Sequence, residues 1–76
     1  MKIETMTFEN ALEWAMEHGY QYIKFSGTTV IWELLTMLWE VEDGNVENGG
    51  EWIIAGSFLF RTNAIWGTDT ETYELS

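Results

Sequence analysis

The sequence predicts an α+β fold in which two helices pack on a small, mostly antiparallel sheet of four to five short strands. Two segments carry apolar residues with helical periodicity. Several short runs rich in aromatic and β-branched residues are bounded by turn-forming residues and follow one another closely, which favours antiparallel pairing. The 76 residues correspond to a single domain, 1–76.

The first predicted helix covers residues 8–18. Thr7 is a good N-cap residue, and Gly19 follows the last residue of the apolar pattern, where glycine commonly ends a helix. The apolar residues expected on its core face are Phe8, Ala11, Leu12, Ala15 and Met16.

The longest apolar run of the sequence, residues 29–43, predicts a central helix that is capped by Thr28 or Thr29. Its polar residues fall on one narrow side of a helical wheel, which leaves an apolar arc of about 220°. We therefore expect a helix that is buried over most of its circumference, with a thin acidic stripe in water. A second interpretation ends the helix near Leu38 and makes 39–42 a strand paired with 51–55.

The remaining elements are short strands and turns. Residues 1–6 alternate weakly and are interpreted as a short first strand or a frayed end, and 43–50 is a polar connector. Gly56-Ser57 marks a turn or bulge, with further turns expected at 62–63 and 67–70. The strands are expected at 20–25, 51–55, 58–61, 64–66 and 71–75, the last of them at a sheet edge.

The charge balance limits the choice of partners. Thirteen acidic residues and three basic ones give a net charge of −10. Such a charge argues against direct binding to nucleic acid or to an anionic membrane and favours a basic protein partner. The alternative is that the acidity serves only solubility.

The sequence contains no motif for catalysis, and we expect neither enzyme activity nor a cofactor. Asp43, Asn45 and Glu47 have the spacing of a calcium loop, but Asn48 and Ile54 replace the glycine and glutamate that an EF-hand needs, so no metal site is predicted. His18 is interpreted as part of a helix end. With no cysteine and no apolar leader in MKIETM, we expect a cytoplasmic protein.

Three glutamates form a ladder on the predicted first helix. Glu9, Glu13 and Glu17 lie at i, i+4 and i+8, about 6 Å apart along the axis. Like charges at this spacing destabilise a helix, and Glu17 also opposes the helix dipole. One interpretation is a row of carboxylates that imitates phosphates, and the other is an ordinary solvated face. Trp14 borders this ladder.

Further acids surround the central helix and the connector that follows it. A carboxylate at the end of a helix is again electrostatically unfavourable, which favours a functional anionic surface over chance. A third group follows in the tail at Asp69, Glu71 and Glu74. The candidate partner-binding residues of the second group are Glu33, Glu40, Glu42, Asp43, Glu47 and Glu51.

The five tryptophans are mostly expected in the core, although Trp32 and Trp39 lie at the edge of the apolar arc. An exposed tryptophan among acids is typical of a binding site for a basic protein surface. By size, lack of cysteine, the Glu9–Glu13–Glu17 ladder and the acidic loop 40–51, the chain resembles small acidic phage-encoded anti-CRISPR proteins that mimic DNA.

This resemblance is one of type and composition over the whole chain and includes no specific motif. It implies a phage-derived inhibitor that acts in the host cytoplasm and blocks the DNA-binding channel of a CRISPR effector complex. The alternative that the residues leave open is a homo-oligomeric interaction module, so that both a monomer and a homodimer are consistent with the sequence.

Overall fold

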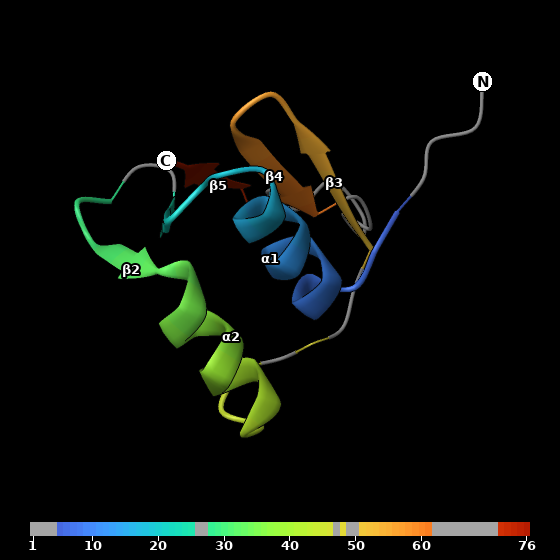
Figure 1. Ribbon diagram of the computed structural model, residues 1–76, viewed down its shortest axis with the longest axis vertical. Helices are drawn as coiled ribbons and strands as arrows, with labels where there is room; N and C mark the ends of the chain where they lie inside the picture. Colours follow the sequence, from blue (N-terminus) through green and yellow to red (C-terminus); the bar gives the residue numbers. More distant parts are fainter. Residues whose placement is uncertain (1–4, 26–27, 47, 49–50, 62–71) are drawn as a thin grey trace.

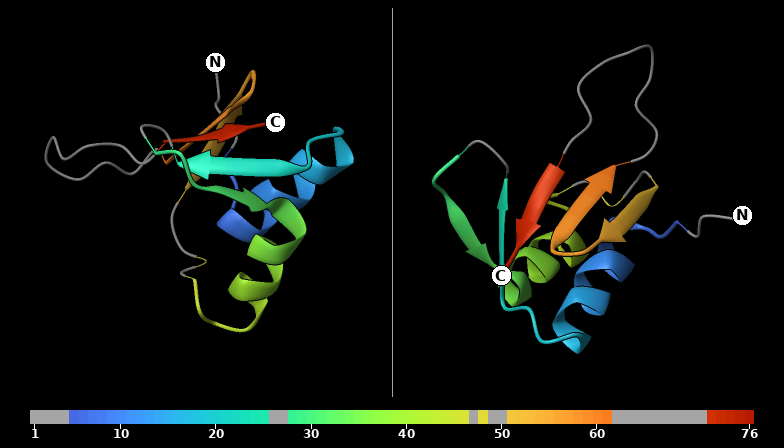
Figure 2. Two further views of the ribbon diagram at one scale, coloured as in Figure 1. Left: turned by 90° about the vertical axis from the view of Figure 1, so that its left-hand side faces the viewer. Right: turned by 90° about the horizontal axis from the view of Figure 1, so that it is seen from above.

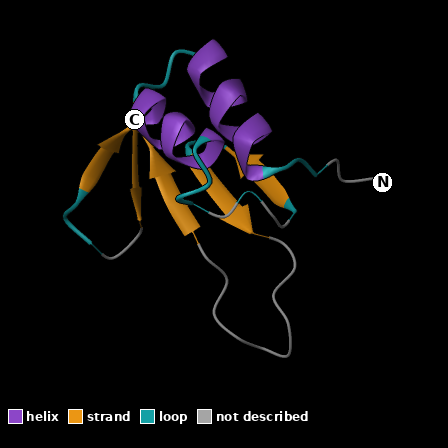
Figure 3. Ribbon diagram, turned by 90° about the horizontal axis from the view of Figure 1, so that it is seen from below, coloured by secondary structure: helices purple, strands orange, loops and turns teal. Residues whose placement is uncertain are grey.

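The α+β prediction is confirmed by a computed structural model, which describes residues 5–25, 28–46, 48, 51–61 and 72–76. Both helices lie on the same face of a five-stranded antiparallel sheet (Figures 1 and 3). In chain order the elements are α1 (Phe8–Glu17), β1 (Tyr22–Phe25), β2 (Ile31–Glu33), α2 (Leu34–Glu42), β3 (Trp52–Ala55), β4 (Phe58–Arg61) and β5 (Thr72–Leu75).

The strand order in the sheet is β2-β1-β5-β4-β3, which places β5 in the centre (Figure 2). The prediction that the last strand lies at an edge is therefore wrong. β5 pairs with β1 through Ile23 and Leu75 and with β4 through Leu59 and Tyr73. These three aliphatic side chains are buried on the helix-covered face, so the core runs directly beneath β5.

Helix α1 forms as predicted. The hydroxyl oxygen of Thr7 accepts a hydrogen bond from the backbone N–H of Asn10 at 3.2 Å, which caps the helix start. The helix ends at Glu17, and Gly19 follows with a φ of 91°, a left-handed value that glycine adopts readily. The buried residues of α1 are Phe8, Ala11, Leu12 and Ala15, while Met16 is half-buried.

The predicted start of the central helix is wrong by five residues. Residues 31–33 form strand β2, which pairs with β1, and α2 begins only at Leu34. Thr28, Thr29 and Ile31 belong to a run of β-branched residues that favours extended backbone. Neither threonine caps the helix: Glu33 occupies the N-cap position and makes no side-chain capping bond.

The predicted burial of this helix is also wrong. Only Leu34, Leu38 and Val41 of α2 are buried, whereas Leu35 is 45% and Trp39 is 55% exposed. This nine-residue helix packs on the sheet and α1 along one stripe, and Leu35 and Trp39 lie outside that stripe. The second interpretation, a strand at 39–42, is wrong because these residues are helical.

Strands β3 and β4 form a hairpin, so that Gly56-Ser57 is the turn of the two predicted alternatives, turn or bulge. Ala55 pairs with Phe58 across the two-residue turn Gly56-Ser57, and Gly56 has a φ of 61°. Met6 pairs with Trp52 as an isolated bridge at the outer side of β3. The predicted strand at 64–66 and the turns at 62–63 and 67–70 lie outside the described residues.

Candidate functional site

The glutamate ladder of α1 divides into two parts. Glu13 and Glu17 are exposed and line a shallow depression of about 330 Å³ together with Trp14 and Asn10. Glu9 is half-buried and does not line this depression, and its backbone N–H donates a hydrogen bond to Asn48 Oδ1 at 2.8 Å. The structure therefore brings Glu13, Trp14 and Glu17 together, and it leaves Glu9 at the helix start.

Trp14 is held in place by His18. The two rings stack with their centroids 3.6 Å apart, and His18 Nδ1 lies 2.8 Å from the carbonyl oxygen of Trp14. His18 is also the C-cap residue of α1, as its position in the sequence indicates. The half-buried indole of Trp14 thus has a fixed orientation beside the two exposed carboxylates.

The second acidic group is not one uniform stripe. Glu33, Glu42 and Asp43 are exposed, and so is Glu51 at the start of the β3 region. Glu40 is half-buried, and its Oε2 accepts a hydrogen bond from Asn45 Nδ2 at 3.0 Å. The predicted solvated stripe is therefore wrong at Glu40. Glu47, Asp69 and Glu71 lie outside the described residues, and Glu74 forms an ion pair with Lys24 at 3.0 Å.

Apolar side chains replace that stripe as the exposed feature of this region. We call them the exposed apolar segment, and they belong to β2, the residue before it, and α2. The sequence signal for it was the position of Trp32 and Trp39 at the edge of the apolar arc. Its members are Val30 (55% exposed), Ile31 (60%), Trp32 (47%), Leu35 (45%) and Trp39 (55%).

Strand β2 is also an edge of the sheet. It pairs with β1 on one side, and no strand among the residues placed by the structure pairs with its other side. At the opposite edge, Met6 and Trp52 exchange two backbone hydrogen bonds of 3.0 and 2.9 Å. An unpaired edge leaves backbone N–H and C=O groups available to another chain.

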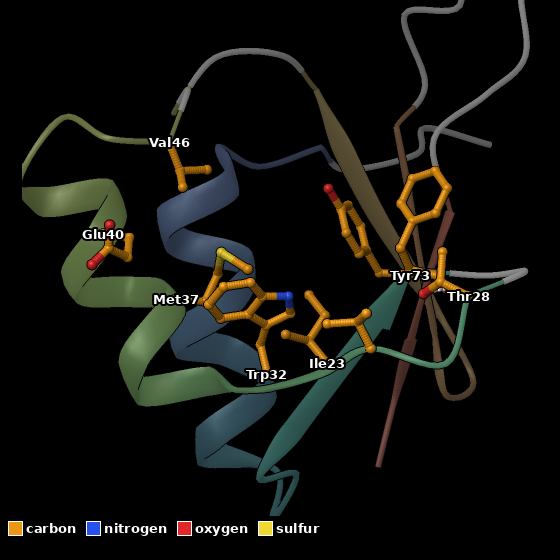
Figure 4. Close-up of a pocket in the computed structure, with 9 residues that line it drawn as sticks. Ile23, Thr28, Trp32, Met37, Glu40, Val46 and Tyr73 are labelled. Atoms are coloured by element: carbon orange, nitrogen blue, oxygen red, sulfur yellow. Dashed lines mark hydrogen bonds between the residues drawn. The ribbon is translucent and has the colours of Figure 1, made fainter.

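A cavity of about 600 Å³ lies between α2 and the adjoining part of the sheet (Figure 4). The described part of its lining consists mainly of aromatic and aliphatic side chains, and Glu40 is the acidic residue among them. The sequence did not predict this cavity, because its walls come from segments far apart in the chain. The lining residues are Ile23, Phe25, Thr28, Val30, Trp32, Met37, Glu40, Val46 and Tyr73.

Metal ligation has no support in the described ranges: no three His, Cys, Asp or Glu side chains there are grouped to hold an ion. Neither α1 nor α2 is long and apolar enough to cross a membrane. Comparisons with protein families, with curated proteins and with solved structures found no match. Function is therefore inferred from the residues of this chain.

Proposed function

We propose that this chain is an acidic protein inhibitor of the DNA-mimic type, which binds the basic DNA-binding channel of a defence complex such as a CRISPR effector. The observation that carries the proposal is the grouping of Glu13, Trp14 and Glu17 on the exposed side of α1. Two carboxylates one helical turn apart offer acceptors to lysine or arginine, and the indole offers an apolar contact.

The spacing of these carboxylates is compatible with a basic channel but does not suffice alone. One helical turn separates charges by about 5–6 Å, whereas one DNA strand carries a phosphate about every 3.4 Å. Additional acids must therefore contribute to the contact. Glu42 and Asp43 at the end of α2 are exposed and supply such charges, with the exposed Trp39 three and four residues before them.

The first test is the dependence of affinity on ionic strength, measured with a purified CRISPR effector complex and this protein. We expect affinity to fall steeply with added salt, because the contact is between opposite charges. Duplex DNA that carries the target sequence should compete with the protein. Simultaneous binding of both, without mutual weakening, would contradict mimicry.

A matched pair of variants separates the α1 carboxylates from net charge. E13Q/E17Q and S57K/S76K each change the net charge by two units in the same direction, but only the first alters the ladder. Ser57 and Ser76 are exposed. We expect the first variant to bind at least about tenfold more weakly, since each charge-assisted bond contributes about 1 kcal/mol or more. Equal weakening by both would remove the ladder from the mechanism.

A second candidate function is a homo-oligomeric interaction module. It is favoured by the exposed apolar segment, which adjoins the open edge of β2. Analytical ultracentrifugation of the wild type, I31K and F58K distinguishes the two functions. Ile31 lies on β2, and Phe58 is an exposed apolar residue on β4, away from the exposed apolar segment. A dimer that only I31K dissociates would support this second function, and a monomer would exclude it.

A further inference from the structure

The cavity under α2 is built by one face of the sheet and one side of the helix. Ile23 and Trp32 are directly paired across β1 and β2, and Phe25 and Tyr73 across β1 and β5. Directly paired residues of antiparallel strands point to the same face, so all four side chains lie on the helix side. Figure 4 shows Trp32 beside Met37 and Ile23, with Glu40 on one side of this group and Tyr73 on the other.

The aromatic walls are accessible from solvent. Trp32 is 47% and Phe25 is 42% exposed, although Ile23 behind them is fully buried. The rings of Phe25 and Tyr73 meet edge to face with centroids 5.3 Å apart, which fixes one wall. The cavity is therefore open, and its volume of about 600 Å³ is in the range of small-molecule sites.

Among the described residues that line this apolar cavity, Glu40 is the one that carries a negative charge. It lies one helical turn from Met37 on the same side of α2, and Asn45 donates to one of its two carboxylate oxygens. No lysine or arginine is among the described residues that line the cavity. Lys24 sits between Ile23 and Phe25 in β1 and so points to the opposite face, where it pairs with Glu74.

We propose that this cavity binds a small organic cation, in which an amine is attached to an apolar body. The apolar body would contact Ile23, Met37 and Tyr73, while the ammonium group would lie between the Glu40 carboxylate and the Trp32 indole. Aromatic faces attract cations, and the attraction is strongest for tryptophan. This activity is separate from the binding of a protein partner by the acidic surface.

Charge and size determine the class of ligand. An anion would meet the Glu40 carboxylate, and a neutral molecule would leave it without a cationic partner. A single lysine or arginine side chain from another protein would fill only part of a cavity of about 600 Å³. A free molecule that carries both an apolar body and a cation fits the lining better.

The test uses three ligands of the same shape: 3-phenylpropylamine, 3-phenylpropanol and 3-phenylpropanoate. Binding is measured by isothermal titration calorimetry, and its place by the NMR shift of the Trp32 indole N–H. We expect the amine to bind about tenfold more tightly than the alcohol and the carboxylate to bind most weakly. Equal affinity for amine and alcohol would overturn the proposal.

Two variants with the same change in charge control for general attraction to an acidic protein. E40Q should reduce the preference for amine over alcohol to about twofold or less, while E42Q, on the exposed side of the same helix, should leave it unchanged. Equal losses in both variants would overturn the proposal. W32L provides a second readout that leaves Glu40 in place: it should also lower the amine preference, and an unchanged preference would contradict the site.

Acetylated arginine amide distinguishes a free amine ligand from an arginine side chain of another protein. If the cavity binds a free amphipathic amine, this compound should bind at least about tenfold more weakly than 3-phenylpropylamine, because it lacks the apolar body. Tighter binding of the arginine amide would overturn the free-ligand proposal in favour of a protein side chain.

Discussion

The two helices lie side by side on one face of the sheet, but they differ in side-chain capping and in how much of their apolar surface is buried. α1 has ten residues, a threonine cap and four buried apolar side chains, and its exposed positions include Glu13 and Glu17. α2 has nine residues, no side-chain cap and three buried side chains, and it exposes Leu35 and Trp39. The apolar side chains of α1 are therefore largely buried within the fold, whereas α2 leaves part of its apolar surface exposed.

The largest expected contrast between the helices is the cost of removing a leucine. L12A in α1 should lower the free energy of unfolding by about 2–5 kcal/mol, because Leu12 is fully buried and the truncation leaves a cavity. L35A in α2 should cost less than about 1 kcal/mol, because Leu35 is 45% exposed. Urea denaturation of both variants provides the measurement. Similar costs would mean that Leu35 is buried in solution, for example in an oligomer.

A smaller contrast is expected at the helix starts. T7A should cost about 1 kcal/mol, because it removes the acceptor of the Asn10 N–H. E33A should change stability by less than about 0.5 kcal/mol, since Glu33 makes no side-chain capping bond. Thermal and urea unfolding of the two variants compare them directly. A larger loss of stability in E33A than in T7A would show that Glu33 stabilises its helix start more than Thr7 does.

The smallest expected contrast concerns the acidic residues at the helix ends. E17K should stabilise the protein by about 0.5–1 kcal/mol, because it relieves the opposition to the dipole and replaces repulsion from Glu13 with an i, i+4 ion pair. E42K should stabilise by about half as much, since Leu38 occupies the equivalent position in α2. Added salt should shrink both gains. A destabilising E17K would indicate that Glu17 has a local partner.

The contrast between the helices also explains how far the sequence predicts the fold. α1 was predictable because its cap, its apolar period and Gly19 all agree. Residues 29–33 were not, because a run of consecutive apolar and β-branched residues fits a helix and a strand equally, and pairing with β1 decides between them. The central place of β5 depends on distant pairings that no local pattern encodes.

The candidate site follows the same division. The exposure of Glu13 and Glu17 follows from helix periodicity alone, and so does their place beside Trp14. The position of Glu40 in a cavity could not be predicted, because the opposite wall includes Tyr73, which is brought there by the pairing of β5 with β1. The local sequence places Glu40 on the polar side of an otherwise apolar helix and gives no sign of a cavity there.

The central position of β5 has a consequence for biosynthesis. Before residues 72–75 leave the ribosome, the nascent chain can form the β1–β2 and β3–β4 hairpins, but β5, which lies between them in the sheet, is still missing. Each hairpin alone is at most marginally stable in water. Ile23 would meanwhile lack its cross-strand partner Leu75, and Leu59 would lack its partner Tyr73. Folding is therefore completed only after β5 has been translated. Until then the apolar side chains of β1 and β4 are accessible to chaperones.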